Sequence, residues 1–252
     1  MKPALILQLR PEDDASDGEY RAFLDKGGLA ESDSVRHRLE AAPLPEGFSL
    51  EDYSAVVLGG GPGCVSDDPA TRDPVEARAE AEVLGLLPEI VARDMPFMGC
   101  CAGIGILAHH LGGEVSKARF GEPVGAVTAT ITDEGQSDPL LKGLPNVFDV
   151  LVGHKEAVQS LPEGALHLMS APSCPVQMIR VKQNVYATQF HPEADGQVFA
   201  ERIRIYKGHG YFAPEEAEAL TEAVLDAQVT QPERILRRFF DRFVKSRNAL
   251  RT

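Results

Sequence analysis

Short apolar runs alternate with helical patterns over the first 110 residues of the chain. The runs cover 4–9, 54–61 and 95–100, and the clearest helical pattern covers 73–94, with Asp73 as its expected N-cap. Strand–helix–strand alternation predicts a mostly parallel central sheet flanked by helices, an α/β fold. The acidic stretch 11–20, which follows the first run, is expected to be a solvated loop at the rim of this sheet.

The pattern changes after about residue 114. Apolar runs at 125–132 and 185–190 lie among Gly and Pro residues and predict short antiparallel strands at the sheet edge. Proline residues at 214 and 232 are expected to open two C-terminal helices. Because no repeat or interdomain linker is visible, we expect one domain over 1–252, with a core of about 1–195 and a helical extension of about 212–250.

Composition excludes several classes of protein. Acidic residues outnumber basic ones by 38 to 25, and the net charge of −13 would repel a phosphate backbone. The basic run at 234–247 has apolar residues at helical spacing, so we interpret it as an amphipathic helix rather than a nucleic-acid patch. A signal peptide, a membrane-length apolar window and a C-x-x-C pair are all missing. We therefore expect a cytoplasmic protein with no nucleic-acid partner, membrane association or metal site.

A strand, a glycine-rich turn and a helix follow one another in "MPFMGCCAGIGILAHHLGG". This order is typical of a nucleophile elbow, in which flanking glycines make room for a strained central residue. In this register the centre is Cys101, whereas the side chain of Cys100 points back into the sheet. A thiol at a helix start meets unpaired N–H groups, so we expect a thiolate nucleophile at Cys101. Taken alone, the stretch is equally consistent with a plain glycine-rich turn.

A cysteine nucleophile needs a base, and "YATQFHPEAD" supplies a histidine at the end of a predicted strand. Glu193 follows His191 by two residues and can hold its imidazole ring. The alternative is a surface histidine in a turn.

An anionic intermediate also needs hydrogen-bond donors. "VVLGGGPG" brings unobstructed backbone N–H groups to the end of another strand, so we expect an oxyanion hole formed by the N–H groups of Gly61 and Ala102. This run could also be a phosphate-binding turn, but it lacks the usual phosphate-loop patterns.

These motifs together resemble the class I, or triad-type, glutamine amidotransferases, including the glutaminase domain of GMP synthase. The matching segments are "GGGPG" at 59–63, "GCCAG" at 99–103 and "QFHPE" at 189–193. The resemblance implies a flavodoxin-like fold and a Cys101–His191–Glu193 triad that attacks the side-chain amide of glutamine. It also implies a γ-glutamyl thioester, release of ammonia and glutamate, and no need for a metal or organic cofactor.

The resemblance extends to the substrate pocket. "VGHKEAVQ" is similar to the family's segment beside the glutamine, which implies substrate-binding roles for residues at the turn after the strand. The predicted substrate-binding residues are Gly60, Gly105, Gly153, His154, Lys155 and Glu156. Gly105 departs from the family, which usually has glutamine there. Because glycine weakens a helix, its presence suggests either close packing or room for a larger substrate.

No synthetase or ATP-binding pattern follows residue 195, so the resemblance implies a stand-alone member. Such a protein would pass ammonia to a separate synthetase or act alone as a γ-glutamyl hydrolase. Two alternatives remain open at this point: a catalytically weak regulatory or binding subunit, and a peptidase or isomerase on a similar sheet.

Overall fold

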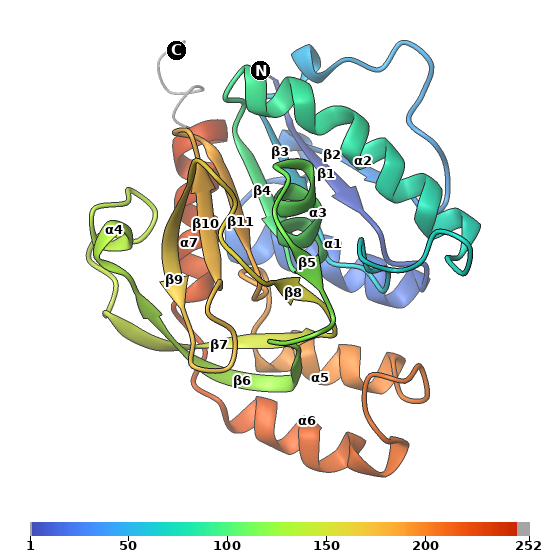
Figure 1. Cartoon of the computed structure of the whole chain (residues 1–252), viewed down its shortest axis with the longest axis vertical. Helices are drawn as coiled ribbons and strands as arrows, with labels where there is room; N and C mark the ends of the chain where they lie inside the picture. The colour runs from blue at the N-terminus through green and yellow to red at the C-terminus, as the bar shows by residue number, and fades with distance from the viewer. Residues whose placement is uncertain (1, 246–252) are drawn as a thin grey trace.

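The computed structural model describes residues 2–245 and has a central sheet between layers of helices (Figure 1). Within this range the sheet contains nine strands in the order β2-β1-β3-β4-β11-β10-β9-β6-β7. Its parallel part consists of β2 (Ser34–Arg38), β1 (Ala4–Gln8), β3 (Ala55–Leu58), β4 (Phe97–Cys100) and β11 (Val185–Thr188). Its antiparallel part consists of β10 (Met178–Val181), β9 (Ala165–Ser170), β6 (Glu122–Ile131) and β7 (Val147–His154). A small second sheet pairs β5 (Val115–Ser116) with β8 (Ala157–Val158).

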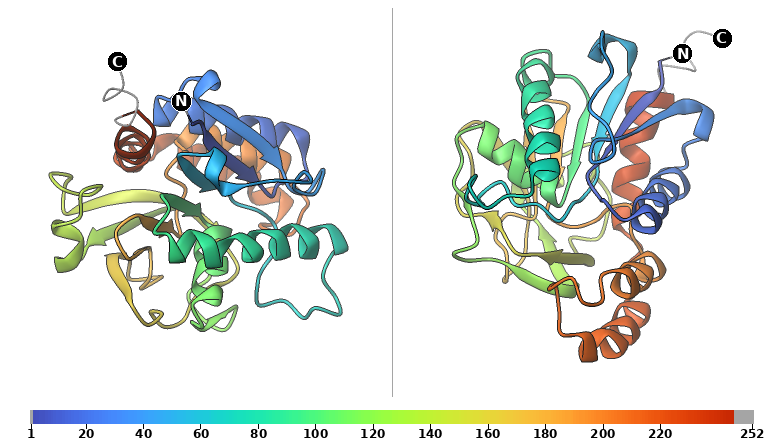
Figure 2. Two further views of the ribbon diagram at one scale, coloured as in Figure 1. Left: turned by 90° about the horizontal axis from the view of Figure 1, so that it is seen from above. Right: turned by 90° about the vertical axis from the view of Figure 1, so that its right-hand side faces the viewer.

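Helices cover both faces of the sheet, as the further views show (Figure 2). One face carries α1 (Asp13–Gly27) and α7 (Pro232–Phe240), and the other carries α2 (Pro74–Ala92) and α3 (Ala102–His110). Helices α5 (Gly196–Ile205) and α6 (Ala217–Asp226) pack together beside the β6–β7 ribbon. The remaining helical pieces are α4 (Asp133–Gln136), three 3-10 turns (Glu31–Asp33, Leu50–Asp52, Pro214–Glu216) and a π-helical turn (Asp241–Lys245). The predicted α/β fold with a helix-flanked central sheet is therefore confirmed. The expectation of an edge strand at 185–190 was wrong, because β11 lies in the middle of the sheet and pairs in parallel with β4.

Each buried strand supplies side chains to two cores, because successive residues of a strand point to opposite faces. In β1, Leu5 and Leu7 join the core under α2 and α3, whereas Ala4 and Ile6 join the core under α1 and α7. Burial on both faces explains why the first apolar runs are continuous rather than alternating.

The acidic stretch 11–20 is not a solvated loop, and that prediction was wrong. Helix α1 begins at Asp13, and Ala15, Ala22 and Phe23 form its buried side. Acidic residues between these positions masked the helical pattern in the sequence. One of them, Glu19, is itself fully buried because it pairs with Arg10.

The other predicted helix starts agree with the structure. The Asp73 side chain accepts hydrogen bonds from the backbone N–H groups of Val75 and Glu76, which caps α2 as expected. Proline begins both the 3-10 turn that precedes α6 and helix α7. Residues 246–250 of the predicted C-terminal extension, and 246–247 of the basic run, lie outside the described residues. The single-domain division stays a prediction.

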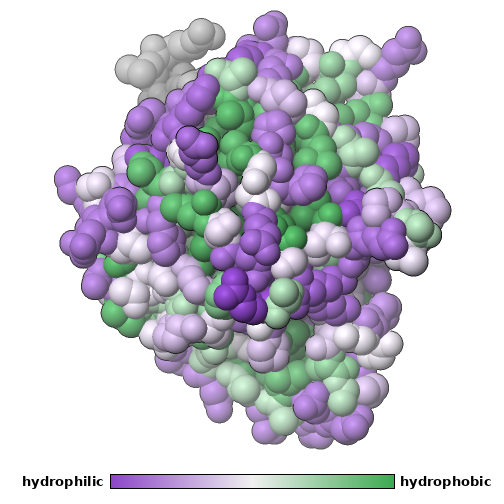
Figure 3. Space-filling view, in the orientation of Figure 1, coloured by the Kyte–Doolittle hydropathy of each residue, from purple (hydrophilic) through white to green (hydrophobic). Residues whose placement is uncertain are grey.

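On the face drawn in Figure 3, hydrophilic residues lie among small clusters of apolar residues. Across residues 2–245, no helix has both the length and the apolar character that crossing a bilayer would require.

Candidate active site

Four neighbouring parallel strands end at one edge of the sheet, and the segment after each contributes to one site. Arg10 follows β1, the glycines 59–61 follow β3, Cys101 follows β4 and His191 follows β11. The Cys101 N–H donates to the carbonyl oxygen of Thr188 at 2.8 Å, which ties the β4 and β11 ends together. Ligands of open α/β sheets bind outside such carboxyl ends, so this edge is the candidate active site.

The turn between β4 and α3 has the geometry expected of a nucleophile elbow. Cys101 lies between the two elements with φ 55° and ψ −98°, a conformation that few non-glycine residues adopt. Cys101 lines the pocket at the sheet edge, whereas the Cys100 side chain is fully buried in the core between the sheet and α1 and α7. The predicted division between the two thiols is therefore confirmed in position. The nucleophilic role of Cys101 stays a prediction.

His191 and Glu193 form the predicted pair at the end of β11. Nδ1 of His191 lies 2.8 Å from Oε1 of Glu193, and both side chains are almost fully buried. The His191 N–H donates to the Leu151 carbonyl oxygen at 3.1 Å, which attaches the turn to β7. Because Nδ1 pairs with the carboxylate, Nε2 is the ring nitrogen left for proton transfer.

Three buried ionic residues at the site, Arg10, Glu19 and Arg202, were not predicted from the sequence. Nη2 of Arg202 lies 2.8 Å from Oε1 of Glu193, and Nε of Arg10 lies 2.8 Å from Oε1 of Glu19. The two pairs meet where Arg202 Nη2 comes within 3.8 Å of the Glu19 carboxylate. For Arg10, its position directly after a predicted strand could have indicated a place at the site. For Arg202 the sequence held no such signal, because an arginine in a helix is usually exposed.

Burial has the largest effect on the pKa of the Cys101 thiol. It raises the pKa of Cys101 to about 11, although the charges of Arg10 and Arg202 and the Ala102 N–H act in the opposite direction. The prediction of a thiolate at the helix start was therefore wrong for the resting protein, because desolvation outweighs the helix terminus. A base has to remove the proton before Cys101 can act as a nucleophile.

The histidine has the protonation state that a base requires. Burial lowers the pKa of His191, and the positive charges of Arg202 and Arg10 reinforce this effect. Burial alone would raise the pKa of Glu193, but the charge of Arg202 and the hydrogen bonds from His191 and Arg202 bring it well below its ordinary value. At neutral pH the site thus holds a thiol, a neutral imidazole and a carboxylate.

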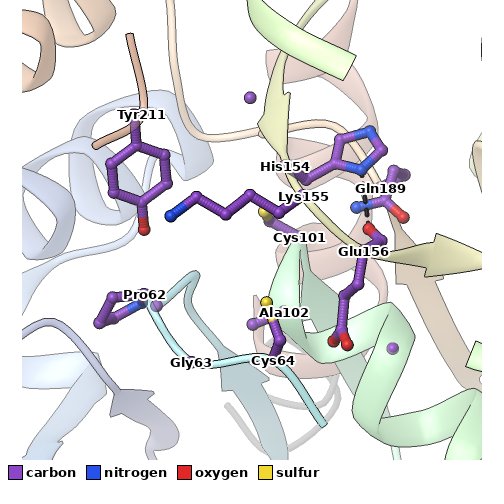
Figure 4. A pocket seen from close by; sticks show the side chains of 13 residues that line it. Pro62, Gly63, Cys64, Cys101, Ala102, His154, Lys155, Glu156, Gln189 and Tyr211 are labelled. Atoms are coloured by element: carbon purple, nitrogen blue, oxygen red, sulfur yellow. Dashed lines mark hydrogen bonds between the residues drawn. The ribbon is translucent and has the colours of Figure 1, made fainter. Parts of the chain in front are cut away.

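A pocket of about 390 Å³ borders Cys101, and we call it the polar pocket because Lys155, Gln189 and His154 are among its lining residues (Figure 4). The ammonium of Lys155 extends across it to the ring of Tyr211, 4.6 Å from the ring centroid. Gln189 also lines the pocket, and its Oε1 is buried without a hydrogen-bond partner among the described residues. The pocket therefore offers a ligand a cation and, among the described residues, an unpaired hydrogen-bond acceptor.

Close packing explains the glycine at position 105. A Cβ atom there would lie 2.9 Å from Oε1 of Glu156, so the carboxylate takes the space that a side chain would need. Glu156 Oε1 accepts a hydrogen bond from the Val65 N–H, and Oε2 accepts from the N–H and the hydroxyl of Ser66. Of the two interpretations of Gly105, the structure favours close packing over extra room.

His154 borders the same pocket, but both its ring nitrogens are engaged. Nδ1 lies 2.8 Å from the Glu156 carbonyl oxygen, the contact drawn in Figure 4, and Nε2 lies 2.8 Å from Oε2 of Glu122. Glu122, His154 and Cys174 place three potential metal ligands within 4.8 Å of one another. However, Glu122 already accepts hydrogen bonds from Gln177 and Ser173, so protein donors satisfy its carboxylate.

A second pocket, of about 450 Å³, also borders Cys101, and we call it the apolar pocket. Its wall is mainly apolar and aromatic and comes from β6, α5 and the segment that follows α5. These residues are Val124, Phe199, Ile203, Tyr206, Tyr211 and Phe212. His191, Arg10 and Arg202 also line it, while Cys101, Gly61, Gly153 and Tyr211 border both pockets.

The glycines after β3 pack against the ionic residues. A Cβ atom at Gly60 would lie 2.7 Å from Arg10 and 2.9 Å from His191 Cε1, so only glycine fits there. The Gly60 N–H donates to Glu19 at 3.2 Å, which holds this turn beside the nucleophile. Gly61 and Ala102, the predicted oxyanion-hole residues, both border the polar pocket with Cys101.

All the residues singled out from the sequence therefore gather at this sheet edge. Cys101, Gly61, Ala102, Gly105, Gly153, His154, Lys155 and Glu156 line the polar pocket, His191 lines the apolar one, and Glu193 and Gly60 contact His191. Their functional roles stay predictions.

Comparison with known proteins bears on the family and the fold of the chain. Residues 27–204 match the family model described as glutamine amidotransferase class-I. The GMP synthases of Thermosipho melanesiensis and Neisseria meningitidis (strain 053442) are 33% and 32% identical to the chain over 152 residues each, covering 60% of it. The chain spans only about a quarter, 26%, of the length of these relatives.

Solved structures share the fold. A glutamine amidotransferase from Thermotoga maritima superposes with a TM-score of 0.73 at 20% identity, covering 97% of this chain and 99% of that one. A glutamine amido transferase from Methylobacillus flagellatus gives 0.72 at 22% identity, covering 97% and 95%. From the family model that matches most of its length, we conclude that the chain belongs to the class I glutamine amidotransferase family.

Proposed function

We propose that this protein hydrolyses the γ-amide of glutamine, or of a γ-glutamyl compound, through a thioester at Cys101. The observation that carries the proposal is the assembly of Cys101, His191 and Glu193 at adjoining strand ends, with a neutral histidine beside a buried thiol. Family membership adds independent support.

The steps follow from the protonation states. Nε2 of His191 takes the thiol proton, and the Cys101 sulfur attacks the Cδ carbon of the amide. The N–H groups of Gly61 and Ala102 stabilise the oxyanion, and the imidazolium donates its proton to the leaving nitrogen. Water activated by His191 then attacks the thioester, releasing glutamate and restoring the thiol. Glu193 orients the ring and stabilises its charged form.

Binding of the amino-acid part is assigned to the polar pocket. Lys155 supplies a cation suited to an α-carboxylate, and the unpartnered Oε1 of Gln189 is suited to an N–H donor. Gly153 also lines this pocket. Glu156 acts by holding the 65–66 segment against α3, since its oxygens are occupied there.

The test is to trap the acyl-enzyme. We expect incubation with glutamine or a γ-glutamyl amide, followed by acid quench and mass spectrometry, to show a γ-glutamyl adduct on Cys101 together with released glutamate. Cys101→Ala should abolish both, whereas the neighbouring Cys100→Ala should retain the adduct. Absence of the adduct and of glutamate from the wild-type protein with every such compound would refute the proposal.

A second candidate role is ammonia supply to a separate synthetase, or regulation of one. The relatives are GMP synthases, and a protein from Thermoplasma acidophilum described as a GMP synthase subunit shares the fold with a TM-score of 0.63 at 20% identity. This role predicts a stable partner in a pull-down from the source cells. Cys101→Ala would then retain the partner. If the protein acted only as a regulator, Cys101→Ala would also leave its cellular function intact.

A further inference from the structure

We infer that the apolar pocket beside His191 holds the leaving amine of the substrate, so that the preferred substrates are γ-glutamyl amides of amines with an apolar or aromatic group. This inference rests on the proposed function and specifies its substrate class.

The direction of the leaving group follows from the position of the general acid. The group that protonates the departing nitrogen has to contact it, and His191 lines the apolar pocket but not the polar one. The groups suited to an α-carboxylate and an α-ammonium, Lys155 and Gln189, line the polar pocket. Cys101 and Gly61 border both pockets, so the scissile bond lies at their junction. The acyl part then occupies one pocket and the amine the other.

The lining of the second pocket indicates what the amine carries. Val124 and Phe212 are half-buried, Ile203 is 1% exposed, and Tyr206 and Tyr211 add aromatic surface. Ammonia from glutamine would leave these apolar and aromatic side chains without an apolar occupant. Burying a hydrocarbon or aromatic group against these side chains favours the larger amide.

The charges at the apolar pocket disfavour amines that carry a second positive charge. Its ionic lining residues are Arg10 and Arg202, and no carboxylate is among the described residues that line it. Their ion-pair partners, Glu19 and Glu193, are not among the lining residues. An amine with a second positive charge would therefore meet cations without a facing anion. We expect polyamine-type leaving groups to be disfavoured.

The reaction balances without a co-reactant other than water. The C–S bond to Cys101 forms and the C–N bond breaks, while the proton taken from the thiol by His191 passes to the amine nitrogen. Water then adds its oxygen to the acyl carbon and its proton returns to the thiolate by way of His191. The products are glutamate and the free amine.

The test compares amides with one acyl group and different amines. The kcat/KM for glutamate release is measured for glutamine and for its N-ethyl, N-phenethyl and N-(4-aminobutyl) amides. Because the alkyl amides have leaving groups of similar basicity, differences among them report binding in the pocket. We expect the phenethyl amide to exceed the ethyl amide by about tenfold to a hundredfold. The aminobutyl amide should not exceed the ethyl amide.

A pocket-filling variant and a matched control locate the effect. Val124→Phe should reduce the preference for phenethyl over ethyl amide to near one. Val147→Phe places the same substitution on β7, where the side chain is 51% exposed, and should leave the preference unchanged. Product inhibition of the wild-type protein by phenethylamine, stronger than by ethylamine, gives a readout that needs no variant.

The outcomes separate this inference from the proposed function. If glutamine forms the Cys101 adduct and is hydrolysed, but phenethyl and ethyl amides are equal or the ethyl amide is better, the inference is wrong and the proposed function stands. If Val147→Phe abolishes the preference as fully as Val124→Phe, the pocket is wrongly assigned. If no compound in the series acylates Cys101, the proposed function fails and the inference fails with it.

Discussion

Arg202 is the residue that links the base to the rest of the ionic network. Its Nη2 pairs with Glu193, and its Nη1 lies 3.1 Å from Nδ1 of His191. The same cation lowers the pKa of the Cys101 thiol against the dominant effect of burial. Because it acts through its neighbours, we regard Arg202 as a positioning residue that also supplies charge to the site.

Replacing Arg202 should change the titration of the nucleophile. In Arg202→Gln the loss of the cation raises the pKa of Cys101, so the thiolate forms only at higher pH. Only the thiolate reacts with iodoacetamide, so alkylation of Cys101 at pH 8 should slow about threefold or more, the factor for a rise of about half a pKa unit. Arg204→Gln on the exposed side of α5 is the matched control. An unchanged pH profile of alkylation would show that Arg202 acts only on structure.

At the scale of elements, one carboxylate joins three segments around the polar pocket. Glu156 follows β7, accepts hydrogen bonds from residues 65 and 66 of the long segment between β3 and α2, and packs on Gly105 of α3. The effects of substitutions at Gly105 and Glu156 on stability should therefore be coupled.

A double-mutant cycle measures this coupling. Gly105→Ala alone should lower the free energy of unfolding by about 1 to 2 kcal/mol, because the new Cβ displaces the Glu156 carboxylate. In the Glu156→Ala background the same change should be neutral or stabilising by up to about 1 kcal/mol, since alanine favours the helix. Urea unfolding supplies the values. Gly85→Ala in α2, where a Cβ meets nothing within 4 Å, should stabilise both backgrounds equally. Additive effects of Gly105→Ala and Glu156→Ala would contradict the coupling.

At the scale of the whole molecule, buried carboxylates link stability to pH. Burial would raise the pKa of Glu122, but hydrogen bonds from His154 and Ser173, with the charge of His154, lower it below its ordinary 4.5. Glu193 shifts in the same direction. A carboxylate with a lowered folded pKa contributes stability above its unfolded pKa, and that contribution is lost as the pH falls through the folded value.

The wild-type protein should accordingly lose stability as the pH falls below about 4.5. Glu122→Gln should lower the stability at pH 7 and flatten this acid dependence, because the amide does not titrate. Urea unfolding at several values of pH between 3 and 7 is the measurement, with the exposed Glu114→Gln as control. A wild-type acid dependence no steeper than that of Glu122→Gln would contradict the assignment.

Much of the fold could be predicted because its signals are local. Apolar runs identify the strands buried on both faces, and Asp73, Pro214 and Pro232 identify helix starts. Helix α1 was missed because its one buried side lies among acidic residues, one of which is buried through its partner Arg10. Burial of a charged residue depends on a partner that local pattern does not reveal.

The amino-acid sequence by itself determined the elbow at Cys101, the His191–Glu193 pair and the glycine turn after β3, because each depends on backbone geometry and residues a few positions apart. Only the tertiary structure decided the protonation of the thiol, the contact of Gly105 with Glu156 and the two pockets. These depend on residues distant in sequence, such as Arg10 and Arg202, which meet only when the strand ends and α5 pack together. Desolvation arises from that packing, so no local pattern could report it.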